Sequence, residues 1–252
     1  MTLPGEETTW FEGYTKYEFE VAGKTAVIVC PKKERPGKFW AWKGEFLNEF
    51  PGTELALLAE GFYIVHLRFP DQFGSPVAIS KWNELYDLLT GKFGFHKKVA
   101  LIGLSRGGLY CYNWAIANPE KTACIFGDAA VADFRSWPMG KGKGPGSKAE
   151  WEKFKKAFGY TSDADAEARM KSPIDNLGPL AKAKVPILNI YGDKDEPVPW
   201  EENAGELAKR YKALGGDIEL IVKPGVGHHP HGLEDPAPIV KFIERHTAGE
   251  GN

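Results

Sequence analysis

Apolar and polar positions along this chain follow two alternating periods. Residues 17–21 alternate apolar with polar, the dipeptide Ala22-Gly23 follows, and 26–30 is an apolar run, which together predict an opening antiparallel hairpin. Beyond the hairpin, short apolar runs typical of buried strands alternate with segments of helical period. The expected strands are 39–42, 62–67, 99–102, 123–126, 185–191 and 218–222. The expected helices are 54–60, 80–89, 108–118 and 150–158.

This order of elements predicts an α/β fold, with a mostly parallel sheet of about eight strands covered by helices. A chain of 252 residues of which 42% are hydrophobic can bury one large core, so we expect a single domain over 1–252. The alternation is interrupted after the expected strand 123–126, the sixth when the two hairpin strands are counted, over about 131–180. Because connections are normally only a few residues long, we expect this insertion to be a functional lid or cap.

The most informative motif is Gly103-Leu104-Ser105-Arg106-Gly107, a G-x-S-x-G sequence between an expected strand and an expected helix. A serine on such a sharp turn projects its hydroxyl out of the sheet, and the flanking glycines keep side chains away from the doubled-back chain. Ser105 is therefore a candidate nucleophile, provided that an acid and a histidine follow after later strands.

Both partners are present in that order. The run 185–191 ends in a turn that holds Asp195, and a glycine-rich loop after 218–222 leads to His228. The carboxyl ends of parallel strands share one edge of a sheet, so the three residues can converge there. The acid could also be Asp128, after the preceding strand, and the sequence does not decide between His228 and His229 as the base.

On these motifs the chain resembles the α/β-hydrolase superfamily over about 15–246. The elbow serine, the acid in a G-x-x-D-x-x-V-P turn and the histidine after G-x-G match Ser105, Asp195 and His228. The segments FWAWKGEF at 39–46, FRSWP at 134–138 and GVGHHPH at 225–231 look similar to a bacterial carbohydrate-esterase-like branch, which is associated with carbohydrate-esterase or peptidase activity. The resemblance implies the α/β-hydrolase fold, a Ser-Asp-His triad and no cofactor.

A serine hydrolase needs two backbone N–H groups to stabilise the oxyanion of its tetrahedral intermediate. We expect the first from Arg106, the residue after the nucleophile, and the second near Trp42 or Lys43 at the end of the strand 39–42. The expected lid adds an aromatic residue, Trp137, beside the basic Arg135. These two residues and Lys43 are candidate substrate-binding residues, which would favour anionic or carbohydrate substrates.

Composition limits the kinds of partner that we expect for this protein. The formal net charge is −2, with no basic stretch, so a nucleic-acid partner is not expected. No run approaches the roughly 18 apolar residues of a membrane span, and residues 1–7 lack the basic and apolar regions of a signal peptide. This favours a cytoplasmic protein, although a secreted protein with its leader removed is also compatible. Composition gives no indication of the oligomeric state.

Cysteine and histidine usage predicts neither disulfides nor a metal. Cys30 and Cys124 lie in apolar strand runs and Cys111 lies in a helical pattern, without disulfide spacing, so we expect free buried thiols. Residues His228, His229 and His231 are clustered, but consecutive histidines rarely face one ion, and no cysteine or paired carboxylate of ligand spacing accompanies them.

The sequence therefore predicts a serine esterase that forms an acyl-enzyme on Ser105. The expected substrates are short-acyl or methyl esters, small or carbohydrate-linked. A serine peptidase of the same fold is the alternative within the enzymes, and a noncatalytic ligand-binding protein is the alternative outside them.

Overall fold

A single twisted sheet forms the centre of the computed structural model, which describes residues 3–247; Met1, Thr2 and 248–252 lie outside it. The strand order is β1-β2-β3-β5-β4-β6-β7-β8-β9. The first four strands in this order pair antiparallel, and all pairs from β5 to β9 are parallel. The strands are β1 Glu6–Thr9, β2 Thr15–Val21, β3 Lys24–Val29, β4 Trp40–Lys43, β5 Tyr63–Arg68, β6 Val99–Leu104, β7 Thr122–Asp128, β8 Ile187–Gly192 and β9 Ile218–Lys223.

The expected opening hairpin is confirmed. Val21 of β2 pairs with Lys24 of β3, which leaves Ala22 and Gly23 as a two-residue turn, with φ values of 56° and 70°. Two consecutive positive φ values give a turn whose twist matches that of the flanking strands.

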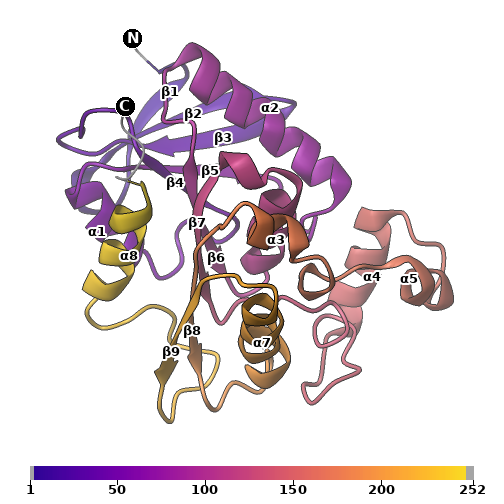
Figure 1. Cartoon of the computed structure of the whole chain (residues 1–252). Helices are drawn as coiled ribbons and strands as arrows, with labels where there is room; N and C mark the ends of the chain where they lie inside the picture. The colour runs from indigo at the N-terminus through magenta and orange to yellow at the C-terminus, as the bar shows by residue number, and fades with distance from the viewer. Residues whose placement is uncertain (1–2, 248–252) are drawn as a thin grey trace.

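Helices cover both faces of the sheet (Figure 1). One face packs against α1 and α8, which contribute Leu57 and Ile243 to its core, and the other packs against α2, α3, α6 and α7, which contribute residues such as Trp82 and Leu207. The helices are α1 Gly52–Ala59, α2 Pro76–Lys92, α3 Gly107–Ala117, α4 Lys148–Phe158, α5 Asp163–Arg169, α6 Gly178–Lys182, α7 Glu206–Ala213 and α8 Ala237–Thr247. The predicted α/β architecture is confirmed.

The sheet has one more strand within residues 3–247 than the sequence predicts. Strand β1 has the sequence EETT, without an apolar residue, and lies at the sheet edge with mostly exposed side chains. Only backbone pairing with β2 defines it, so an apolar period cannot detect it.

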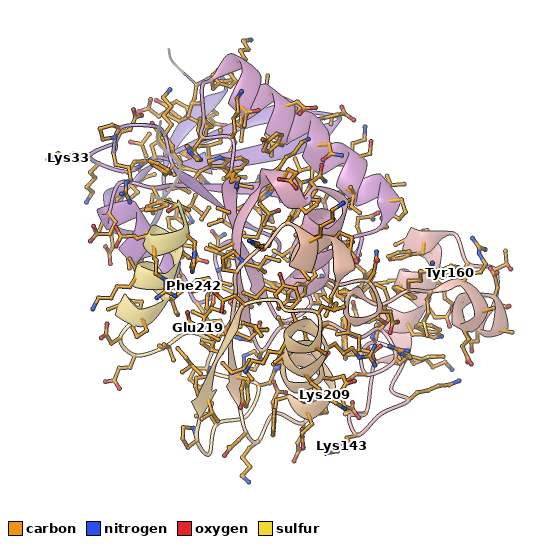
Figure 2. All side chains as sticks on the ribbon, viewed as in Figure 1. Lys33, Lys143, Tyr160, Lys209, Glu219 and Phe242 are labelled. Atoms are coloured by element: carbon orange, nitrogen blue, oxygen red, sulfur yellow. The ribbon has the colours of Figure 1, made fainter. Side chains whose placement is uncertain are left out.

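The insertion after β7 contains α4 and α5, which lie to one side of the sheet in Figure 1. It has its own apolar cluster, in which Phe134, Trp151 and Phe154 pack with Phe73 from the main body. Tyr160, labelled in Figure 2, stacks on Phe158 at 5.7 Å between ring centroids. The insertion is therefore a packed structure, and its action as a lid stays a prediction.

Candidate active site

Ser105 sits on a strained turn between β6 and α3. Its φ is 50°, a left-handed value that non-glycine residues rarely adopt and that is often retained at functional sites. The turn is fixed because the Ser105 N–H donates to the Asp128 carbonyl at 2.9 Å and the Ser105 carbonyl accepts from the N–H of Gly108 and of Val131, each at 3.0 Å. A Cβ at Gly103 would lie 2.7 Å from the Gly108 Cα, so the motif needs glycine for this close approach.

The structure brings Ser105 together with His228 and Asp195. The Ser105 Oγ lies 2.9 Å from His228 Nε2, and His228 Nδ1 lies 2.8 Å from Asp195 Oδ2. The other carboxylate oxygen of Asp195 accepts the Val198 N–H at 2.8 Å. This carboxylate is buried, with 1% of its side chain exposed, so its bond to His228 is little screened by water.

Close packing of two loops sets this geometry. A Cβ at Gly192, the last residue of β8, would lie 2.2 Å from the Val226 carbonyl oxygen. The Val226 carbonyl also accepts the Lys194 N–H at 2.9 Å. The glycine-rich loop after β9 therefore crosses directly over the end of β8, which places His228 beside the turn that carries Asp195.

The rival acid, Asp128, faces a different histidine. Its Oδ1 lies 3.2 Å from His231 Nδ1, and its Oδ2 accepts the Gly232 N–H at 2.5 Å. His231 is buried, whereas His229 is exposed. Of the alternatives that the sequence leaves open, the geometry favours Asp195 and His228 as partners of Ser105.

His229 stacks on the exposed ring of Phe50, with centroids 5.7 Å apart. The pKa of His229 is lowered from its ordinary value, first by desolvation and then by the neighbouring His231 and His228. Both effects disfavour the protonated form of this imidazole.

A cavity of about 370 Å³ opens beside the Ser105 hydroxyl, a size typical of small-molecule sites. Its lining consists of Ser105, Leu104, the three histidines of the 228–231 loop, and three residues that follow β4: Phe46, Glu49 and Phe50. Apart from the histidines, Glu49 is the only acidic or basic residue among those that line this cavity. No sequence pattern singled out the three residues after β4 as lining residues, because their place beside Ser105 depends on how that loop folds.

Phe46 belongs to a loop that packs on the turn after the serine. A Cβ at Gly44 would lie 2.7 Å from the Gly107 carbonyl oxygen, and a Cβ at Gly107 would lie 3.2 Å from the Glu45 nitrogen. Phe46 has a φ of 58°, so the backbone reverses at this point of the cavity wall.

The expectation that Trp42 supplies the second oxyanion donor is not met. Trp42 lies within β4, paired with Val65 on one side and Leu101 on the other. Its ring is fully buried and stacks on Trp82 at 4.1 Å. The strand continues to Lys43, and only after it does the loop turn toward Ser105.

The prediction that Lys43 contacts the substrate is also wrong. Its side chain is fully buried, and its ammonium bonds to the Glu54 carboxylate at 3.0 Å and to the Glu49 carbonyl at 2.8 Å. A buried lysine with these partners holds the loop after β4 in place and has no surface to offer a ligand.

The expected basic lid does not face the cavity. Arg135 pairs with Asp133 at 2.7 Å and with Asp175 at 2.9 Å, and it lines a separate pocket. Trp137 is partly buried and packs against the apolar cluster of the insertion, with its ring 6.0 Å from that of Phe73. The charges of this segment are matched by acids: Lys143, labelled in Figure 2, pairs with Glu201 at 2.7 Å.

Arg106 links the elbow to the insertion. Its guanidinium bonds to Glu45 at 2.6 Å, to Asp71 at 3.0 Å and to Glu150 of α4 at 2.5 Å. Burial opposes the charge, but the three carboxylates outweigh it and raise the pKa of Arg106 above its ordinary value. The side chain is thus structural, while the backbone N–H of this residue remains beside Ser105.

Comparison with known proteins places the chain in a family. The profile of the Alpha/beta hydrolase family matches residues 36–242, which is most of the chain, so the protein belongs to that family. A search of curated proteins finds no match.

Solved structures share the fold at low identity. They include a puromycin-hydrolysing peptidase of Mycobacterium tuberculosis (TM-score 0.71, 13% identity, 94% of this chain and 40% of that one). Dipeptidyl peptidase 4 of Porphyromonas gingivalis (TM-score 0.69, 14% identity) matches over 92% of this chain and 36% of that one. Acylaminoacyl peptidase of Pyrococcus horikoshii (TM-score 0.69, 14% identity) matches over 94% of this chain and 42% of that one. The chain thus spans about two fifths of the length of these proteins.

Within residues 3–247, no helix is long and apolar enough to cross a membrane.

Proposed function

We propose that this protein is a serine hydrolase that cleaves acyl compounds through an acyl-enzyme on Ser105. The observation that carries the proposal is the pair of bonds from Ser105 Oγ to His228 Nε2 at 2.9 Å and from His228 Nδ1 to Asp195 Oδ2 at 2.8 Å. Serine is a weak nucleophile at its ordinary pKa and needs such a base, and the base needs a carboxylate that fixes its tautomer.

In the first half of the reaction, the Ser105 Oγ attacks the acyl carbon while His228 Nε2 takes its proton. The tetrahedral intermediate collapses when the bond to the leaving group breaks, and the His228 imidazolium gives that group the proton. A water then attacks the acyl-enzyme, with His228 again as the base, and Ser105 recovers its proton as the acid product leaves. The Asp195 carboxylate orients His228 and stabilises the imidazolium.

The intermediate's oxyanion would lie between the N–H groups of Arg106 and Phe46. Arg106 directly follows the nucleophile at the start of α3, where the helix dipole also favours negative charge. Phe46 supports the second assignment because it lines the cavity with Ser105 and belongs to the loop that packs on Gly107. One such donor typically contributes about a hundred- to a thousandfold in rate.

For the substrate class, we infer that peptide-like acyl compounds with a free amino group fit better than acidic carbohydrate esters. Glu49 is the only acidic residue that lines the cavity, whereas the cations of Lys43 and Arg135 are bound elsewhere. A lone carboxylate attracts a protonated amine and repels an anionic substrate. The three solved structures described above are of peptidases, which supports the same choice. Short neutral esters remain a second candidate, because Phe46, Phe50 and Leu104 give the cavity an apolar wall.

The test compares wild-type protein, Ser105→Ala and Ser80→Ala, a control at an exposed serine of α2. The substrates are p-nitrophenyl acetate, aminoacyl p-nitroanilides with free or acetylated amino groups, and acetylated glycans. We expect turnover by wild-type and Ser80→Ala protein, a loss of at least about a thousandfold in Ser105→Ala, and preference for the free amine.

Preference for the acetylated glycans would replace the peptide-like class with the carbohydrate esters that the sequence predicts. Absence of Ser105-dependent turnover, together with no labelling of wild-type protein by a fluorophosphonate, would refute the hydrolase proposal and favour a ligand-binding protein.

A further inference from the structure

The histidine loop holds three imidazoles around one point. His228, His229 and His231 each offer a ring nitrogen, and these nitrogens lie within 4.8 Å of one another. Their ring centroids form a nearly equal triangle, with separations of 5.0, 5.0 and 4.9 Å. Histidines so close in sequence rarely face one ion. The turn of the chain at 228–231 nevertheless brings these three side chains together.

His231 is the member whose chemistry the triad does not use. It is 7% exposed, its Nδ1 lies 3.2 Å from Asp128 Oδ1, and its Nε2 has no hydrogen-bond partner among the described residues. In a neutral imidazole whose Nδ1–H donates to this carboxylate, Nε2 carries the lone pair. A buried lone pair without a donor is unfavourable, and a carboxylate behind an imidazole is the usual arrangement of a metal-binding histidine.

His228 has the same arrangement. Its Nδ1 bonds to Asp195, which leaves its Nε2 lone pair facing Ser105. His229 is exposed and can rotate to complete the set. Asp128 is held in turn by the Gly232 N–H, and Lys223 fixes the loop through the Pro230 carbonyl at 2.6 Å. Two ligands are thus oriented before a cation arrives, and the third lies at the surface, where its side chain has room to rotate.

We propose that His228, His229 and His231 form a binding site for a late first-row divalent cation such as Zn²⁺, and that the bound cation inhibits the hydrolase. The inference rests on the proposed function, because inhibition requires that His228 be the base. Neutral imidazoles select Zn²⁺, Ni²⁺ or Cu²⁺ over Mg²⁺ or Ca²⁺, which prefer oxygen. A water or the Ser105 hydroxyl would complete a four-coordinate site.

Inhibition follows from a shared lone pair. The Nε2 lone pair of His228 accepts the proton of Ser105 in the reaction and would bind the cation in the complex, and it cannot do both. Zn–N bonds of about 2.0–2.1 Å place tetrahedral ligands roughly 3.4 Å apart. The three ring nitrogens now lie within 4.8 Å of one another, so any pair must approach by at most about 1.4 Å. Rotation of the exposed His229 and a small shift of His228 away from Ser105 would provide this.

The experiment is calorimetric titration of ZnCl₂ into untagged wild-type protein, Ser105→Ala, His229→Gln, His231→Gln and the control His246→Gln. His246 lies on α8, next to Arg245 and apart from the loop. We expect one site in wild-type, Ser105→Ala and His246→Gln, affinity lower by at least about tenfold in His229→Gln and His231→Gln, and no site for MgCl₂ or CaCl₂. Because His229 is exposed, its variant tests the site even if His231→Gln fails to fold.

In the same samples, Zn²⁺ should abolish p-nitrophenyl acetate hydrolysis by wild-type protein, and EDTA should restore it. Absence of a Zn²⁺ site in wild-type protein, or equal affinity in His229→Gln and His246→Gln, would overturn the proposal, whether or not the protein hydrolyses esters. A site with these ligands that leaves hydrolysis unaffected would overturn the inhibitory role. Binding by Ser105→Ala needs no turnover, so the metal site can be confirmed even if the proposed hydrolase function fails.

Discussion

Replacing Asp195 by asparagine tests the proposed triad at the hydrogen bond between Asp195 and His228. Asp195 Oδ1 accepts the Val198 N–H at 2.8 Å, and Oδ2 faces His228 Nδ1 at 2.8 Å. In Asp195→Asn the carbonyl oxygen must stay at the Val198 N–H, because only an oxygen can accept that bond. The new amide NH₂ therefore faces His228 Nδ1.

The consequence is a change of tautomer. His228 Nδ1 becomes an acceptor, its proton moves to Nε2, and an Nε2–H cannot take the proton of Ser105. We expect kcat/KM to fall by about 10³- to 10⁴-fold, which corresponds to about 4–5.5 kcal/mol of transition-state stabilisation. Folding should change little, because the substitution is nearly isosteric.

The matched control is Asp128→Asn, which alters the other carboxylate–histidine pair. Asp128 bonds to His231 and to the Gly232 N–H, and only its backbone carbonyl contacts Ser105. We expect kcat/KM to stay within about tenfold of wild type. The assay is p-nitrophenyl acetate hydrolysis, with thermal unfolding of each variant. A thousandfold loss in Asp128→Asn with little effect of Asp195→Asn would refute the assignment of the acid.

Three further predictions concern stability and reactivity. Gly103→Ala should lower the free energy of unfolding by about 2–3 kcal/mol, measured by urea denaturation, because its Cβ would lie 2.7 Å from the Gly108 Cα; an unchanged midpoint would contradict the close packing of the elbow. Burial lowers the pKa of His66 to about 4 from 6.5, so the unfolded state binds the proton first as pH falls below 6.5. The free energy of unfolding at pH 5 should therefore be roughly 1–2 kcal/mol lower than at pH 8. This pH dependence should be smaller in His66→Gln, and an equal pH dependence in both proteins would contradict the prediction. Burial also raises the pKa of the Cys30 thiol to about 12, so a disulfide reagent at pH 8 should modify this thiol only after denaturation, and rapid modification of the folded protein would show that it is accessible.

The sequence alone was sufficient for the architecture. The alternation of short apolar runs with helical segments predicts the parallel sheet, because strands buried on both faces, such as β6 and β7, are continuously apolar. It did not reveal β1, whose polar residues are ordered only by pairing with β2.

The site could be predicted where chemistry leaves a local pattern. Ser105 lies in a motif whose glycines are required by the backbone itself, and Asp195 and His228 follow strand ends that share a sheet edge. Which of two acids meets which of two histidines depends on the loop that crosses Gly192, and a contact of that kind has no local signature.

Long-range packing decided the surroundings of the serine. From the sequence, Lys43 and Arg135 are cations that could bind a substrate. In the fold, Glu54 pairs with Lys43 and Asp175 pairs with Arg135. The sequence determined the sheet and the three residues proposed for the reaction, because their signals come from neighbouring positions. The cavity wall at Phe46 and Glu49, the partners of each charge and the meeting of three imidazoles arise only when loops distant in sequence pack together, and only the tertiary structure decided them.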